Sequence, residues 1–203
     1  MPQSPIDDLL KKLHDLQIEL ESEIDRILRE KRELFKYTLE KGRVKFEQGI
    51  QEWQRYQKTN IWSYLRHARL GHILTAPIVY SVLFPFMLLD IVVTLYQHIC
   101  FRIYKIPIVE RSKYVIIDRQ HLAYLNLIEK INCVYCGYCN GLIEYVREIS
   151  ARTEQYWCPI KHAQRSPDPH RLVEKFIDYG DVESYKKRLL ELRKDIIRTK
   201  KEI

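Results

Sequence analysis

The chain has 203 residues, of which 30% are charged, and its formal net charge is +7. Such a basic balance fits nucleic acid or anionic lipid, but no cluster of Arg, Lys and aromatic residues resembles a nucleic-acid-binding module. We therefore expect no nucleic acid and a lipid bilayer as partner. The five cysteines indicate reduced thiols in the cytosol, and the N-terminus lacks the pattern of a secretory signal.

Residues 1–60 are predicted to form a charged helical stalk, either a helical hairpin or a short coiled coil. Apolar residues recur every seven positions, which keeps one stripe of a helix facing a partner helix. The series consists of Ile6, Leu13, Leu20, Ile27 and Leu34. It restarts out of phase at Leu39, Phe46 and Trp53, which predicts a break near Gly42. This helix is the candidate contact for a protein partner or a second copy of the chain.

Residues 61–106 are predicted to form an interfacial helix followed by a membrane anchor. Between Arg69 and Arg102 the only formal charge is Asp90. This stretch is longer than the roughly 20 apolar residues needed to cross a bilayer. A buried pair of helices in a soluble protein is the alternative, but so long a run without Lys, Arg or Glu rarely belongs to a soluble core.

The prolines in the anchor leave two membrane arrangements open. In one, residues 73–96 form a tilted span kinked at Pro85, and Asp90 faces a partner or a water-filled cavity. In the other, Pro77 and Pro85 break the helix and the chain re-enters as a shallow hairpin. Basic residues flank both ends of the anchor, as the positive-inside rule predicts for a hairpin that starts and ends on one side.

Residues 107–165 are predicted to form a small helical, cysteine-rich domain that binds a metal ion. Gly137 and Gly141 indicate a loop that bends closely around a small group. One zinc ion could be held by two thiolates of this loop and by two donors of the downstream segment. Its four ligands would be Cys133, Cys136, Cys158 and His162.

A [4Fe–4S] cluster is the second alternative, with Cys139 replacing His162 as the fourth ligand. The run Cys-x2-Cys-x2-Cys followed by a distant Cys-Pro partly resembles bacterial ferredoxins, which implies a cluster held by four cysteines. This chain departs from them because the segment is predicted to be helical and carries the motif once. A third alternative is that the thiols bind no metal.

The run RTEQYWCPIKHA, with YCGYCNG upstream, resembles an uncharacterised family of bacterial membrane-associated proteins. The resemblance covers roughly Tyr114 to Arg165. It implies a bacterial source and a membrane location, and it implies no activity, substrate or cofactor.

Residues 166–203 are predicted to contain a basic C-terminal helix, capped by Asp181 and packed on the N-terminal stalk. The chain as a whole is thus expected to be all-α and to lie on the cytoplasmic side of a bacterial inner membrane. Its leading predicted function is a membrane-anchored, zinc-binding scaffold or adaptor. An iron–sulfur electron-transfer protein is the alternative, and an enzyme acting on a lipid-soluble substrate comes third.

Overall fold

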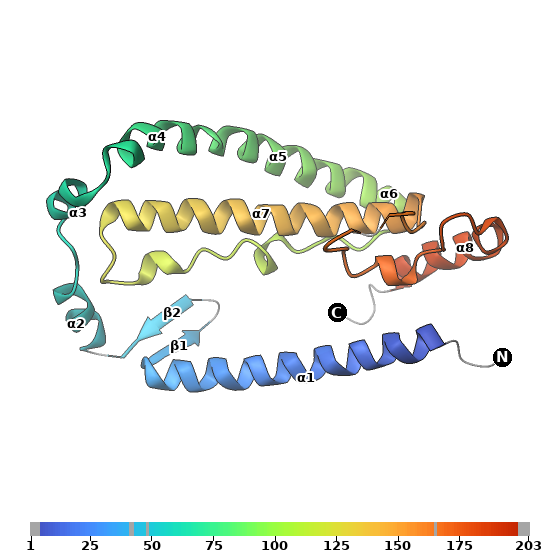
Figure 1. Ribbon diagram of the computed structural model, residues 1–203, viewed down its shortest axis with the longest axis horizontal. Helices are drawn as coiled ribbons and strands as arrows, with labels where there is room; N and C mark the ends of the chain where they lie inside the picture. Colours follow the sequence, from blue (N-terminus) through green and yellow to red (C-terminus); the bar gives the residue numbers. More distant parts are fainter. Residues whose placement is uncertain (1–4, 41–42, 48, 165, 199–203) are drawn as a thin grey trace. The chain divides into compact units, whose positions relative to one another are not determined.

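A computed structural model describes residues 5–40, 43–47, 49–164 and 166–198 (Figure 1). It is 70% helical and 5% strand, which confirms the all-α prediction in its coarse form. The chain divides into two compact units, each built from two segments of sequence. The first unit contains Met1–Ser63 and Asp118–Lys130, and the second contains Tyr64–Ile117 and Ile131–Ile203.

The first unit opens with helix α1, Pro5–Leu34, which is followed by an antiparallel pair of strands, β1 (Tyr37–Glu40) and β2 (Arg43–Phe46). The predicted helical hairpin is therefore wrong beyond Leu34. Apolar and polar residues alternate in both strands, which is a period of two and suits a half-buried strand. The short helix α2, Ile50–Tyr56, comes next. Its Gln54 accepts a hydrogen bond from the Ala123 N–H at 3.1 Å and joins the two segments of this unit.

The second unit begins within helix α3, Ile61–His67, and continues into one unbroken helical run of 35 residues, Leu70–Tyr104. We call Leu70–Tyr104 the apolar run. It comprises α4 (Leu70–Ser81), α5 (Leu83–Tyr96), the π-helical turn η1 (Gln97–Phe101) and α6 (Arg102–Tyr104).

The chain does not reverse at either proline of the apolar run, unlike the predicted hairpin. Pro77 lies inside α4. Pro85 lies in the first turn of α5, where a backbone N–H has no partner within that helix. The Phe86 N–H donates to the Val82 carbonyl at 3.4 Å and carries the helix across the junction. The run is long and apolar enough to cross a membrane.

The apolar run ends at Lys105, whose φ of 61° lies in the left-handed region. The Ile106 N–H then donates back to the Phe101 carbonyl at 2.9 Å, a pattern that closes a helix C-terminus. The chain next runs back along the second unit as a largely irregular stretch, residues 105–117, which we call the return segment. It contains only one short 3₁₀ turn, η2, Arg111–Lys113.

Helix α7, Leu127–Trp157, follows a second short 3₁₀ turn, η3, Arg119–His121. Its start is fixed by a reciprocal cap, in which the Asn126 side chain accepts from the Glu129 N–H and the Glu129 side chain accepts from the Asn126 N–H. Within the second unit, α7 runs parallel to the apolar run, because Tyr80, Thr94 and Tyr96 bond to successively later residues of α7 (Figure 1).

The core of the second unit lies where α7 meets the end of the apolar run and the C-terminal segment. Its buried residues include Phe101, Leu142, Tyr145, Ile149, Phe176 and Ile196. The C-terminal segment contains the turn η4, Val173–Lys175, and helix α8, Val182–Arg198. Asp181 accepts from the Ser184 N–H at 2.9 Å, which confirms the predicted cap. Leu192 and Ile196 of α8, expected to pack on the stalk, are buried within this unit.

Candidate functional site

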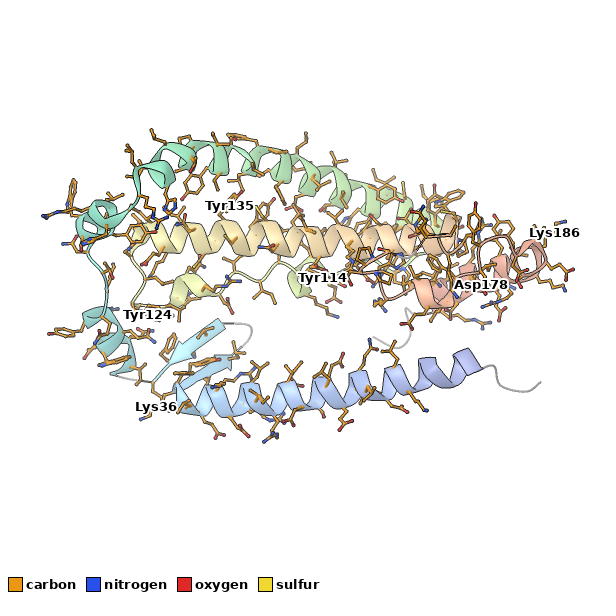
Figure 2. All side chains as sticks on the ribbon, in the orientation of Figure 1. Lys36, Tyr114, Tyr124, Tyr135, Asp178 and Lys186 are labelled. Atoms are coloured by element: carbon orange, nitrogen blue, oxygen red, sulfur yellow. The ribbon has the colours of Figure 1, made fainter. Side chains whose placement is uncertain are left out.

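Several polar groups of the apolar run bond to α7. The Tyr80 hydroxyl donates to Asn132 of α7, and the Tyr135 hydroxyl of α7 donates to the Val79 carbonyl at 3.0 Å. Figure 2 labels Tyr135 on α7. Further along, the Tyr96 hydroxyl lies 3.0 Å from the Thr153 hydroxyl. Helix α7 thus satisfies polar groups over much of the length of the apolar run.

Asp90, the single charge of the run's apolar part, is paired inside the second unit. Two Arg111 nitrogens of the return segment donate to its carboxylate at 2.7 and 3.2 Å. The Tyr138 hydroxyl donates at 3.0 Å, and the Thr94 hydroxyl donates at 3.3 Å. Only 15% of the Asp90 side chain is exposed. Because a buried charge is tolerated when it is paired and hydrogen-bonded, Asp90 anchors the return segment to the run.

Gln97 forms the next contact and is almost fully buried. Its amide nitrogen donates to the Tyr145 hydroxyl of α7 and, at 3.3 Å, to the Val109 carbonyl. Its amide oxygen accepts from the Val109 N–H at 3.0 Å. One side chain therefore joins the run, α7 and the return segment. Spacing could have identified this stripe, since Asp90, Thr94 and Gln97 lie three or four residues apart, as on one helix face.

The apolar run also carries a ridge of exposed apolar side chains, which is interrupted at Ser81, whose hydroxyl donates to the Ile78 carbonyl at 2.7 Å. Phe84 is 75% exposed and Leu88 is 63% exposed. The ridge consists of Ile78, Phe84, Leu88, Leu95, Ile99 and Ile103, all exposed. An exposed apolar ridge that follows the length of a helix marks a contact with a membrane or with another protein.

An ion-pair network joins α7 to the return segment and to the C-terminal segment. Glu148 and Arg152 are buried, and Arg152 donates to Glu148 at 2.8 Å and to the Pro107 carbonyl at 2.8 Å. Arg171 also donates to Glu148, at 2.5 Å. Burial acts to raise the pKa of Glu148, but the hydrogen bonds from Arg171 and Arg152 outweigh it and hold that pKa below its ordinary value.

The predicted cysteine loop is wrong, because Cys133, Cys136 and Cys139 all lie within the unbroken helix α7. The glycines beside them serve close packing. A Cβ atom on Gly141 would lie 2.5 Å from the Tyr114 carbonyl oxygen, and one on Gly137 would lie 3.1 Å from the Ile116 carbonyl oxygen. Figure 2 labels Tyr114 on the return segment, which lies against these two positions. The two glycines thus leave room for the backbone of the return segment to lie against α7.

The predicted ligands do not converge on one site. Cys158 follows the last residue of α7, and the helical rise of ~1.5 Å per residue separates it from Cys139 by about 28 Å. His162 follows a bridge between Ile160 and Ile177, so Cys158 and His162 do not share the helical turn that the zinc arrangement requires. Among the described residues, no group of three or more His, Cys, Asp or Glu could hold a metal ion.

The three thiols of α7 differ in exposure. Cys133 is half-buried, Cys136 is exposed and Cys139 is buried. Burial raises the pKa of the Cys139 thiol, so this side chain stays protonated and behaves as a small apolar residue. Neither the zinc nor the iron–sulfur arrangement fits these positions, since both require Cys158 beside the thiols of α7.

Together, the described residues define a mostly helical protein, and among them one exposed apolar helix is long enough to cross a membrane. No family model matches the chain, and no curated protein or solved structure matches it.

Proposed function

We propose that this protein is a membrane-attached adaptor of the cytoplasmic face of a bacterial inner membrane. The apolar run attaches it to lipid, and α1 offers a contact surface to another protein chain. The observation that carries the proposal is the division of the run into two faces. Asp90, Gln97 and the hydroxyls of Tyr80 and Tyr96 are bonded to α7 or the return segment, and an exposed apolar ridge lies elsewhere on the run.

The outward ridge supports lipid as the partner because of its composition and length. The 35 residues of the run correspond to about 52 Å of helix, which exceeds the hydrocarbon thickness of about 30 Å. The basic residues before and after the run are suited to anionic headgroups.

Helix α1 supports the adaptor role. The described members of its seven-residue series are all exposed: Leu13, Leu20, Ile27 and Leu34. An exposed stripe with this period is what a partner helix covers in a coiled coil. Metal binding is not part of the proposal, because about 28 Å of α7 separates Cys158 from Cys139. The same separation prevents the four cysteines from holding one iron–sulfur cluster, so electron transfer is not part of the proposal either.

Vesicle flotation tests the attachment. The full chain is mixed with vesicles of phosphatidylcholine and phosphatidylglycerol and centrifuged through a density gradient. We expect the wild type to float and a triple ridge variant to stay at the bottom, because charged side chains are costly in hydrocarbon. The ridge variant is Phe84→Glu, Leu88→Glu and Leu95→Glu.

A matched control places the same charges on another exposed apolar surface. The control is Leu16→Glu, Ile24→Glu and Leu28→Glu in α1, where all three side chains are exposed. It should float like the wild type. Loss of flotation in the control with retention in the ridge variant would assign the lipid contact to α1 and overturn the proposal.

A further inference from the structure

We infer that the apolar run lies in the plane of one anionic lipid leaflet, with its outward ridge in hydrocarbon, and does not cross the bilayer. This inference rests on the proposed membrane attachment and specifies its geometry. It follows from what lies beside the run in the second unit, because both neighbours would have to enter the bilayer with a crossing helix.

The return segment is the first obstacle to crossing. It contacts the run at Gln97 through Val109 and at Asp90 through Arg111. Irregular backbone is not found in contact with lipid inside the hydrocarbon layer, where its polar groups lack partners. The segment also carries Glu110 and Lys113, whose side chains are 62% and 55% exposed. A bilayer around Asp90 would enclose these charges.

Moving the crossing stretch along the run does not remove the obstacle. Within residues 70–101, a stretch of about 20 residues that avoids Asp90 has to end at Leu89. That position would leave the later apolar side chains in water. They include Ile91, Val92, Leu95, Ile99 and Ile103, each more than half exposed. Only an orientation along the leaflet covers the ridge from Ile78 to Ile103.

The elements beside the run supply the polar face that an in-plane helix normally has on its own surface. Interfacial helices have one apolar and one polar face. Here the polar side is formed by α7 and the return segment, which cover Asp90 and Gln97. Glu144 and Ser150 of α7 are exposed to solvent.

Basic side chains lie at both ends of the run, where an in-plane helix meets headgroups of the same leaflet. Arg66 and Arg69 precede it and Arg102 and Lys105 close it, and all four are exposed. Juxtamembrane Lys and Arg are attracted to anionic lipid within a Debye length of the surface. Charge at both ends therefore matches one anionic surface.

Depth-dependent fluorescence quenching tests the orientation in the full chain. The natural tryptophans are replaced by phenylalanine, and one tryptophan is placed on the ridge as Ile78→Trp, Leu88→Trp or Ile99→Trp. Each variant is bound to anionic vesicles whose lipids are brominated either high on the acyl chain or at its end. We expect stronger quenching by the high bromines at all three positions, with the same quenching ratio. A control with Leu190→Trp on α8 should not be quenched.

A crossing helix would give a different pattern, with Leu88→Trp quenched more by the chain-end bromines and the other two positions quenched more by the high bromines. That pattern overturns the in-plane orientation while leaving membrane attachment intact. Absence of quenching at every position overturns both the orientation and the attachment.

Labelling of the two flanks gives a second readout that keeps the natural tryptophans. Ala68→Cys and Ser112→Cys are treated with an impermeant maleimide outside sealed vesicles, and modified peptides are quantified by mass spectrometry. In-plane binding predicts complete labelling of both positions without detergent. Protection of one position until detergent is added contradicts it.

Discussion

Glu148 shows how a single buried carboxylate joins three parts of the second unit. Arg152 on the same helix and Arg171 from the C-terminal segment donate to it, and Arg152 also donates to Pro107 of the return segment. Removing one member of such a network leaves the opposite charges buried without a partner, which is more costly than the loss of one hydrogen bond.

Glu148→Gln should destabilise the protein by about 3 kcal/mol at neutral pH, because Arg152 stays buried. Since the folded pKa of Glu148 lies below its ordinary value of 4.5, its stabilisation is present above that value and is lost as the pH falls through the folded pKa. Thermal melts followed by circular dichroism from neutral to acidic pH measure both effects. The variant should lose part of the acid sensitivity of the wild type.

Glu144→Gln is the matched control, since the Glu144 side chain is 57% exposed and lies 3.7 Å from Arg147. It should change the melting midpoint little. Equal acid sensitivity in the wild type and in Glu148→Gln would contradict the role given to Glu148.

Gly141 is a second residue whose effect follows from local geometry. Gly141→Ala places a methyl group 2.5 Å from the Tyr114 carbonyl oxygen, so the return segment has to move. We expect a loss of about 1–3 kcal/mol, as for overpacked cores. Gly71→Ala is the control, because nothing lies within 4 Å of its new Cβ atom and alanine favours helix. If both variants have the stability of the wild type, the return segment does not rest on Gly141.

At the level of elements, the continuity of α7 determines how its thiols react. Cys136 and Cys158 are exposed and should react with maleimide in the native state, and Cys139 should react only after unfolding because it is buried and its pKa is raised. Peptide mapping by mass spectrometry over a time course measures the order. Native modification of Cys139 at the rate of Cys136 would contradict a continuous, packed α7.

Helix α1 gives a second prediction at this level, which commits to a second copy of the chain as its partner. Leu20→Lys with Ile27→Lys should abolish self-association, because both residues belong to the seven-residue stripe and are exposed. Ile18 is exposed but lies off the stripe, so Ile18→Lys should have no effect on self-association. Sedimentation in detergent measures the mass. A wild type that is monomeric at all concentrations would contradict self-association through α1.

The sequence predicts helices where long periodicity controls local structure and fails where tertiary contacts decide. The lack of charge around Asp90 indicates the apolar run, and Asp181 indicates the start of α8. Gly137 and Gly141 have the sequence signal of loop residues, because a glycine required for close approach inside a helix has the same signal as one in a turn. Nothing local to Cys139 and Cys158 shows that an unbroken helix separates them.

At the level of the whole molecule, we propose a scaffold in which α7 and the return segment pair Asp90 and Gln97 of the apolar run and leave its apolar ridge exposed. In this proposal, the exposed ridge and the basic residues at both ends of the run contact the same anionic leaflet. This surface explains how a chain with 30% charged residues also holds a 35-residue apolar helix whose outer face is exposed.

Photo-crosslinking to lipid tests whether the ridge contacts the bilayer. The full chain is bound to anionic vesicles that contain a phospholipid with a photoactivatable group in its acyl chain, and crosslinked peptides are identified by mass spectrometry. We expect crosslinks at the ridge residues Ile78, Phe84, Leu88, Leu95 and Ile99, and none at Gln97 or on α8. Crosslinks spread equally over α7 and α8, or absent from the ridge, would contradict it.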